Sequence, residues 1–154
     1  MKTINGDIIR LSEQGYFDVL VHGCNCFHTM GAGLAKQIKQ RYPQSYHVDL
    51  LHTKRGDREK LGKFSVVEVK SKINELHTFY IINAYTQYEY GKKDNYADYT
   101  AIKKVFQKIK DDYGTLRIAY PKIGAGLAGG DWKKISKIIN NTLNECNHTL
   151  VLWE

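Results

Sequence analysis

The pentapeptide Gly-Ala-Gly-Leu-Ala occurs twice in this 154-residue chain, at residues 31–35 and 124–128. Each copy lies between a short apolar run and a segment whose apolar residues recur every three to four positions. The apolar run predicts a strand, and the periodic segment predicts a helix. The chain is therefore expected to contain strand–loop–helix units, which favours a sheet covered by helices.

Six apolar runs bounded by turn residues predict strands, at residues 3–9, 19–24, 64–69, 79–85, 116–120 and 149–153. Helical periodicity is clear at residues 34–42, which end before Pro43, at 99–109, and at 132–143, where Asp131 is a suitable N-cap. We therefore expect one α/β domain over residues 1–154, a three-layer α/β/α fold with a mixed, largely parallel central sheet. Because residues 11–18 are too few for a helical crossover, part of the sheet is expected to be antiparallel there.

The composition indicates an anionic partner without specifying it. Lysine and arginine number 23 against 16 aspartates and glutamates, which leaves a net charge of +7. No apolar run reaches the roughly 18–20 residues of a membrane span, and the N-terminus has no signal-peptide pattern. We expect a cytoplasmic protein with no membrane contact, whose three cysteines (Cys24, Cys26 and Cys146) are reduced thiols.

Both glycine loops have the pattern of an anion-binding turn. Glycine permits positive φ and close approach of a ligand to the main chain, and the following helix N-terminus presents free N–H groups. Two such loops at adjacent strand ends suit a ligand with two phosphates, or with one phosphate and a second polar group. The alternative is that both are tight turns without a ligand.

Neither loop matches a more familiar nucleotide motif. The first lacks the G-x-x-x-x-G-K-[ST] pattern of a P-loop. The second spells G-x-G-x-x-G across Gly124, Gly126 and Gly129, but too few residues follow to build a nicotinamide-binding half.

The segment between His22 and His28 contains several candidate functional groups. Its His-x-Cys-x-Cys-x-His spacing does not favour zinc, because alternate residues of a strand lie about 6–7 Å apart. Asn25 offers a donor and an acceptor to a ligand hydroxyl or a water, or it caps its own loop. His22 is either a general acid or base or a hydrogen-bonded interior residue. Cys24 and Cys26 are expected to be small buried packing groups.

Nucleic acid is an alternative partner for the positive charge. Two clusters carry it, Lys54-Arg55 with Arg58 and Lys60, and a lysine group at residues 133–137, while tyrosines recur at residues 85–96. No nucleic-acid-reading motif accompanies them, so solvated faces and a rim over the ligand crevice are the expected roles.

Several motifs together resemble the macrodomain, the ADP-ribose-binding module. They are Asn5-Gly6-Asp7-Ile8-Ile9, then Val21-His22-Gly23-Cys24-Asn25-Cys26 leading to the first glycine loop, and Pro121-Lys122-Ile123-Gly124-Ala125-Gly126-Leu127 leading to Asp131-Trp132. The resemblance covers essentially the whole chain in the correct order. The H-x-C-N-C segment, the glycine loop after it and the helix that ends in Arg41-Tyr42-Pro43 are similar to the branch with yeast ADP-ribose 1″-phosphate phosphatase and phage proteins. The third motif, with its Asp-Trp, is also similar to the branch that removes ADP-ribose from protein carboxylates or DNA.

The resemblance implies a role for each matched residue. Asp7 would accept from the adenine amino group, with Ile8 beside the ring. Asn25 would hold the distal ribose. The implied contacts of the distal ribose and phosphates come from the glycine loops, at Gly31, Ala32, Gly33 and Leu34 and at Ile123, Gly124, Ala125, Gly126 and Leu127.

The resemblance also separates the implied reactions. In the branch that removes ADP-ribose from protein carboxylates or DNA, a lysine and an acidic residue are used, whereas this chain has Thr86 or Gln87 and Ala128 there. His22 matches the histidine of the phosphatase branch. The favoured expectation is metal-independent hydrolysis of ADP-ribose 1″-phosphate, with His22 and Asn25 as catalytic residues and no cofactor. A glycohydrolase acting on ADP-ribosylated protein or nucleic acid, and a reader without turnover, are the alternatives.

Overall fold

The computed structural model describes residues 1–91 and 96–153. Part of the tyrosine-rich segment predicted as a rim, residues 92–95, lies outside the described residues. The strands are β1 (Lys2–Asn5), β2 (Val19–Cys24), β3 (Phe64–Lys70), β4 (Thr78–Tyr85), β5 (Ile118–Tyr120) and β6 (His148–Leu152). The helices are α1 (Ile8–Glu13), α2 (Gly33–Arg41), α3 (Gln44–His52), the 3-10 turn η1 (Arg58–Lys60), α4 (Tyr99–Tyr113) and α5 (Trp132–Thr142).

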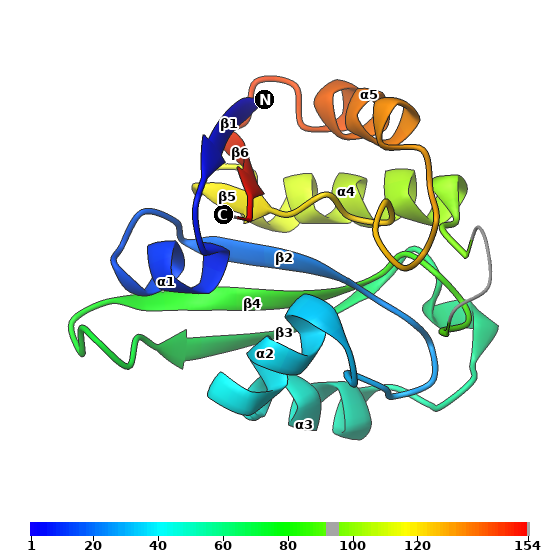
Figure 1. Cartoon of the computed structure of the whole chain (residues 1–154), viewed down its shortest axis with the longest axis horizontal. Coiled ribbons are helices and arrows are strands. Elements are labelled where there is room, and N and C mark those ends of the chain that lie inside the picture. The colour runs from blue at the N-terminus through cyan, green and yellow to red at the C-terminus, as the bar shows by residue number, and fades with distance from the viewer. Residues whose placement is uncertain (92–95, 154) are drawn as a thin grey trace.

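The six strands form one sheet in the order β1-β6-β5-β2-β4-β3, and every neighbouring pair is parallel except β3 with β4. Helices α1, α2 and α3 lie over one face, and α4 and α5 lie over the other (Figure 1). The predicted three-layer α/β/α fold with a mixed, largely parallel sheet is confirmed.

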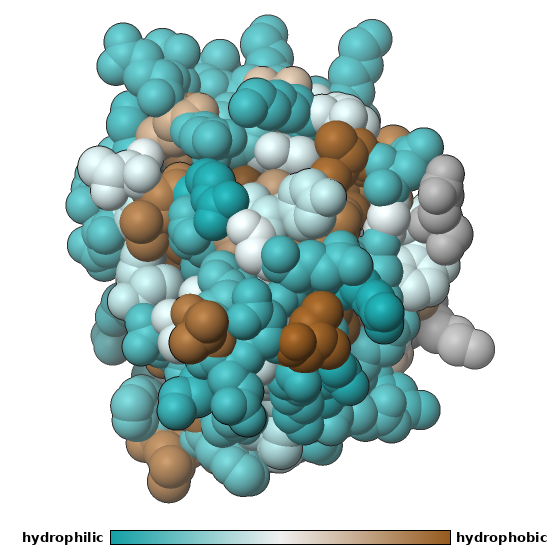
Figure 2. Space-filling model, turned by 90° about the vertical axis from the view of Figure 1, so that its left-hand side faces the viewer, coloured by the Kyte–Doolittle hydropathy of each residue, from teal (hydrophilic) through white to brown (hydrophobic). Residues whose placement is uncertain are grey.

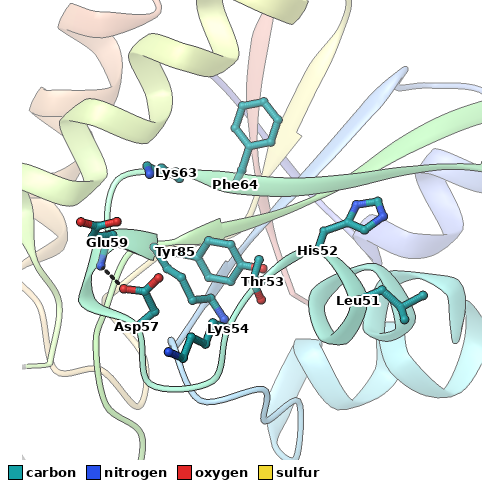
Figure 3. A pocket seen from close by; sticks show the side chains of 10 residues that line it. Leu51, His52, Thr53, Lys54, Asp57, Glu59, Lys63, Phe64 and Tyr85 are labelled. Atoms are coloured by element: carbon teal, nitrogen blue, oxygen red, sulfur yellow. Dashed lines mark hydrogen bonds between the residues drawn. The ribbon is translucent and has the colours of Figure 1, made fainter.

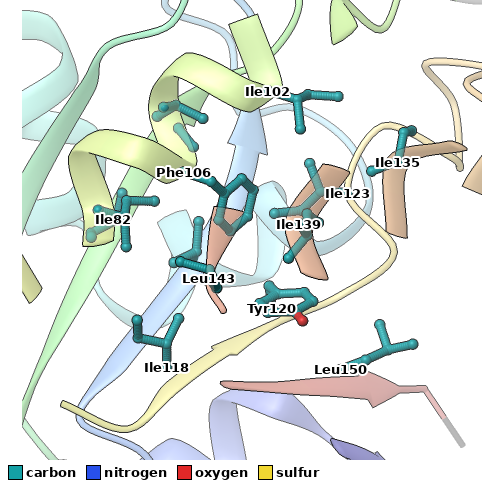
Figure 4. Close-up of a cluster of buried hydrophobic side chains, with 14 of the residues drawn as sticks. Ile82, Ile102, Phe106, Ile118, Tyr120, Ile123, Ile135, Ile139, Leu143 and Leu150 are labelled. Atoms are coloured by element: carbon teal, nitrogen blue, oxygen red, sulfur yellow. The ribbon is translucent and has the colours of Figure 1, made fainter. Parts of the chain in front are cut away.

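The core lies in two layers, one on each face of the sheet. Figure 4 shows the larger layer, in which Phe106 of α4 and Ile139 of α5 point toward Tyr120 of β5. The apolar stripe predicted for residues 99–109 forms this contact, since Ile102, Val105, Phe106 and Ile109 are all buried. The second layer packs α1 and α2 against the opposite face of the same strands. Helices therefore pack against both faces of the sheet, and this packing holds the strand ends and the loops that follow them in position.

The chain begins differently from the prediction, because the expected strand at residues 3–9 ends at Asn5. The Asp7 side chain accepts hydrogen bonds from the Ile9 and Arg10 amides at 3.0 and 3.3 Å, so it caps a helix that contains Ile8 and Ile9. The antiparallel pair is also elsewhere. It joins β3 to β4, whereas β1 lies at the far edge beside β6 and is not paired with β2.

Helix α3 was missed by the sequence analysis. Pro43 ends α2 as expected, but with φ of −58° it also starts the next helix.

The surface on the side of the β3–β4 turn is mainly hydrophilic. Figure 2 shows this side, where hydrophobic residues form separate groups between hydrophilic ones. Of the described helices, none combines the length and apolar character that crossing a membrane requires.

Candidate functional site

The strand ends expected to carry the site do lie together. Strand β2 is central, with β5 on one side and β4 on the other, and all three run parallel. Their carboxyl ends therefore meet at one edge of the sheet, where crossovers leave a crevice. The first glycine loop follows β2, and the second follows β5.

A cleft of about 720 Å³ lies beside this edge. Four of the residues predicted to bind ligand line it, namely Ile8, Leu34, Ala125 and Gly126. The other lining residues are Asn5, Gly6, Gln37, Pro121, Lys122, Val151, Leu152 and Trp153. The cleft thus brings together the Gly-Asp-Ile segment and both glycine loops, which are far apart in the sequence.

The first glycine loop has the features predicted for an anion-binding turn. Gly33 has φ of +56°, a conformation that favours glycine, and neither Gly31 nor Gly33 has an atom within 4 Å of an added Cβ. Ala32 is the N-cap of α2 and offers no side-chain hydrogen bond to the first helical amides. The N-terminus of this nine-residue helix therefore presents free N–H groups, and Leu34 at its start lines the cleft.

The second glycine loop divides into a buried half and an open half. Ile123 is 2% exposed and belongs to the core, and the Cβ that Gly124 lacks would meet the Ile135 side chain at 3.1 Å. Gly126 instead faces open space, and Leu127 is 65% exposed. Unlike α2, helix α5 has a side-chain N-cap, because the Asp131 carboxylate accepts from the Lys133 amide at 2.9 Å. Ala125 and Gly126 are therefore the predicted residues of this loop that line the cleft.

The predicted adenine contacts lie at the start of α1. Ile8 is 4% exposed and lines the cleft. One oxygen of the Asp7 carboxylate, Oδ1, is engaged with the helix amides. Its other oxygen makes no hydrogen bond to any part of the chain that the structure describes, so Asp7 keeps an acceptor for a ligand while it caps the helix.

Asn25 directly follows β2, and its side chain holds its own loop together. Its Nδ2 donates to the Thr29 hydroxyl at 2.6 Å and to the Thr29 carbonyl at 3.2 Å. Its Oδ1 accepts from the Phe27 amide at 2.8 Å. This is the loop-capping arrangement left open by the sequence. A carboxamide oxygen has two lone pairs, so one acceptor position remains beyond the Phe27 bond.

His22 lies inside the sheet layer and is only 2% exposed. Its Nε2 is 2.7 Å from Oδ1 of Asn83, whose Nδ2 donates to the Ser45 carbonyl and the Ser65 hydroxyl. Because Asn83 uses its amide as a donor, His22 Nε2 carries the proton of that bond. Burial lowers the His22 pKa to about 4, and the ring is neutral at pH 7. His22 does not line the cleft.

The two neighbouring cysteines are buried thiols, in line with the packing role expected of them. Burial raises the pKa of Cys24 well above its ordinary value and that of Cys26 to about 11. Neither is a thiolate at neutral pH. Within residues 1–91 and 96–153, no three His, Cys, Asp or Glu side chains are placed to hold a metal ion.

Three side chains of the cleft were not singled out from the sequence. Trp153 stands at the cleft wall with 67% of its surface exposed, and Gln37 and Lys122 line the same space. A tryptophan this exposed is unusual, and its large flat face suits a base. Its position at the end of the last predicted strand was the available signal, but only the pairing of β6 with β1 brings it to the same cleft as Ile8.

A second cavity of about 460 Å³ lies between α3, the 53–63 loop and the start of β3 (Figure 3). It shares no lining residue with the cleft. Buried polar groups lie at its base, where Asp49 Oδ1 accepts from the Tyr85 hydroxyl at 2.6 Å and from Lys60 Nζ at 3.3 Å. The ion pair and hydrogen bond with Asp49 compensate the charge of Lys60, which is why this lysine can be buried with only 4% of its surface exposed.

Comparison with known proteins identifies the class. Residues 21–139 match the model of the Macro domain family, so the chain belongs to that family. An uncharacterized 17.5 kDa protein of Enterobacteria phage T4, from the tk-vs intergenic region, is 36% identical over 159 residues, which cover 100% of this chain and 97% of the phage protein.

Two activities are named among the curated relatives. The ADP-ribose 1″-phosphate phosphatase of Saccharomyces cerevisiae is 22% identical, over 96% of this chain and 95% of the yeast protein. The DNA ADP-ribosyl glycohydrolase of Mycobacterium tuberculosis is 28% identical over 86% of this chain but only 36% of its own length.

The fold is shared with solved structures. Thermosipho africanus DarTG in complex with ADP-ribose superposes with a TM-score of 0.75 at 19% identity, covering 99% of this chain and 42% of that one.

Proposed function

We propose that this macrodomain binds ADP-ribose in the 720 Å³ cleft and hydrolyses ADP-ribose 1″-phosphate to ADP-ribose and inorganic phosphate. One observation carries the proposal. The start of α2, which has no side-chain cap, and the segment Ala125–Gly126 of the second glycine loop lie at the same cleft. Backbone amides from both sides suit a diphosphate. The 22% identity with the yeast phosphatase over nearly the whole of both chains supports this choice of reaction.

The ligand is proposed to run along the cleft from α1 toward Asn25. Adenine would lie between Ile8 and Trp153, with Asp7 accepting from its amino group. The diphosphate would lie between the α2 N-terminus and the segment Ala125–Gly126, where Gly31, Gly33 and Gly126 leave open space for it. The distal ribose would then reach Asn25, which lies in the loop between β2 and α2.

The reaction needs a water, an acceptor for its proton and a proton for the leaving group. The water oxygen forms a bond to phosphorus while the bond from phosphorus to the 1″-oxygen breaks. One proton of the water is passed to that oxygen, and the other stays on the released phosphate. The free acceptor position of Asn25 Oδ1 is proposed to orient the water or the ribose. Amide donors of the glycine loops would stabilise the charge on the phosphoryl oxygens.

His22 is proposed to assist proton transfer, and its burial restricts how it could do so. A ring that is 2% exposed can reach a substrate only through a neighbour or after the end of β2 moves. The contact with Asn83 favours a positioning role, in which His22 holds the end of β2. These two roles predict different behaviour of a glutamine variant, as described below.

The second candidate is removal of ADP-ribose from modified protein or DNA. The 28% identity with the mycobacterial glycohydrolase favours it. At the two positions where that branch uses charged groups, this chain has the uncharged residues Ala128 and Gln87. Ala128 is buried, and Gln87 Nε2 donates to the Glu89 carbonyl at 2.8 Å. We therefore rank it after the phosphatase.

Three assays on the same purified protein separate the candidates. Phosphate release from ADP-ribose 1″-phosphate in the presence of a chelator is expected for the phosphatase. Loss of label from ADP-ribosylated protein or oligonucleotide without phosphate release would identify the glycohydrolase. Calorimetric binding of ADP-ribose with no product in either assay would indicate a reader, and absence of ADP-ribose binding would overturn all three.

A further inference from the structure

Three loops that are distant in the sequence meet beside Asn25. The Cys26 amide donates to the Tyr88 carbonyl at 2.9 Å, and the Gly56 amide donates to the Cys26 carbonyl at 2.6 Å. The Tyr88 hydroxyl closes the set by donating to the Gly56 carbonyl at 2.7 Å. Residues 26–28, 55–58 and 87–90 are thus held together as one surface, although the sequence presents them as unrelated segments.

The side chains on this surface are aromatic rings and arginines in mutual contact. The Phe27 ring lies 4.9 Å from the Tyr88 ring, edge to face, and 6.0 Å from the Tyr90 ring. The Arg58 guanidinium lies 3.9 Å above the Tyr88 ring centroid, and that of Arg55 lies 5.6 Å from the Phe27 centroid. We call these five residues the aromatic–arginine surface.

This surface is open and positively charged. Tyr90 is 49% exposed, and Arg55 and Arg58 are exposed as well. Within the described ranges, neither arginine forms an ion pair with a carboxylate. Three acids stand in or beside these segments, namely Asp57, Glu59 and Glu89, and the Asp57 carboxylate accepts from the Glu59 amide. Stacking on the rings holds the two guanidinium groups in place without neutralising them.

We infer that the aromatic–arginine surface binds single-stranded nucleic acid. Arginines supply the contacts to phosphate, and exposed rings and guanidinium planes are the faces on which unpaired bases stack. A duplex hides its base faces, so these rings could not reach them. An acidic peptide would use the charge but would gain little from the exposed face of Tyr90.

The surface lies beside the loop that carries Asn25 and is separate from the residues that line the cleft. The Phe27 amide donates to Asn25, so the surface begins at the loop that carries Asn25, yet none of its five residues lines the cleft. The inference therefore does not depend on which ADP-ribose derivative is hydrolysed.

Fluorescence anisotropy with a labelled 12-residue oligothymidylate, and with an oligouridylate of the same length, tests the inference. We expect dissociation constants of roughly 1–100 μM at physiological salt. Arg55→Glu with Arg58→Glu should weaken binding at least tenfold and flatten its salt dependence. Tyr90→Ala should weaken it about fivefold, as for one lost stacked base, while Tyr90→Phe should not.

The matched control is Lys133→Glu with Lys137→Glu, the same change of charge on exposed residues of α5. Equal weakening by both charge reversals, no binding by the wild-type protein, or equal binding of polyglutamate would each overturn the inference. Both oligonucleotides are expected to bind, because phosphate contacts and base stacking are available in DNA and RNA alike. The affinity of the same variants for ADP-ribose, measured by calorimetry, is expected to be unchanged, and it reports separately on the cleft.

Discussion

The Nε2 atom of His22 lies 2.7 Å from Oδ1 of Asn83, and both side chains are buried. The bond joins β2 to β4 at aligned positions of the parallel pair, next to the loop that carries Asn25. Because Asn83 also contacts Ser45 and Ser65, the His22 ring belongs to a polar group that fills the space between the sheet and α3.

This burial predicts a loss of stability in mild acid. The His22 pKa is lowered to about 4 from an ordinary 6.5, as is that of buried His148. Between these two pH values the unfolded chain binds protons that the folded protein does not, so stability falls as the pH falls. We expect the free energy of unfolding to drop by about 1 kcal/mol per histidine from pH 7 to pH 5.5, measured by urea denaturation. His22→Gln should remove about half of this dependence, and an unchanged pH profile in that variant would contradict it.

The role of His22 in catalysis can be separated from its role in packing. Glutamine can donate to Asn83 but cannot accept and release a proton at neutral pH. If His22 transfers a proton, His22→Ala and His22→Gln will both lose most phosphate release. If it only positions the end of β2, His22→Gln will retain activity at an unchanged KM while His22→Ala loses it.

Trp153 is expected to supply a stacking face for the base. Trp153→Ala should weaken ADP-ribose binding about tenfold, since base–aromatic stacking contributes roughly 1–3 kcal/mol. Trp153→Phe should retain most of the affinity. Tyr16→Ala, which removes another exposed ring outside the cleft, is the control in the same calorimetric titration. Equal affinities for wild type and Trp153→Ala would place the base elsewhere.

Gly126 tests the close approach of the ligand to the second loop. A Cβ at this position meets no atom within 4 Å, so Gly126→Leu should leave the free energy of unfolding within about 0.5 kcal/mol. Its side chain would fill the cleft, and ADP-ribose binding should fall at least tenfold, with a smaller loss for Gly126→Ala. A folded Gly126→Leu protein that binds normally would show that the two loops do not enclose the ligand.

Gly33 and Gly31 form a matched pair for backbone strain. Both have open space around an added Cβ, but only Gly33 has positive φ. Gly33→Ala should therefore destabilise the protein by about 1–2 kcal/mol, whereas Gly31→Ala should change its stability little. Denaturant unfolding of the two variants measures the difference, and equal stabilities would mean that Gly33 tolerates a side chain.

The sequence predicts local elements better than it predicts which strands pair. The strand at residues 19–24 and the stripe of α4 follow from apolar periodicity, which is a local property. Ile8 and Ile9 read as a continuation of β1, because a run of apolar residues does not distinguish a strand from a short capped helix. The antiparallel pair was misplaced because the neighbours of β1 depend on β6, at the other end of the chain.

The sequence by itself determined the αβ alternation, the two glycine loops and the family, because each strand, helix, loop and family motif is a pattern of residues close together in the chain. Only the tertiary structure decided that Ile123 and Gly124 pack into the core while Gly126 lines the cleft, that His22 is buried against Asn83, and that Trp153 lines the same cleft as Ile8. Burial and contact are properties of segments that meet from distant positions. That is also why the arginines at 55 and 58 become part of one surface with Phe27 and Tyr88 only after the chain has folded.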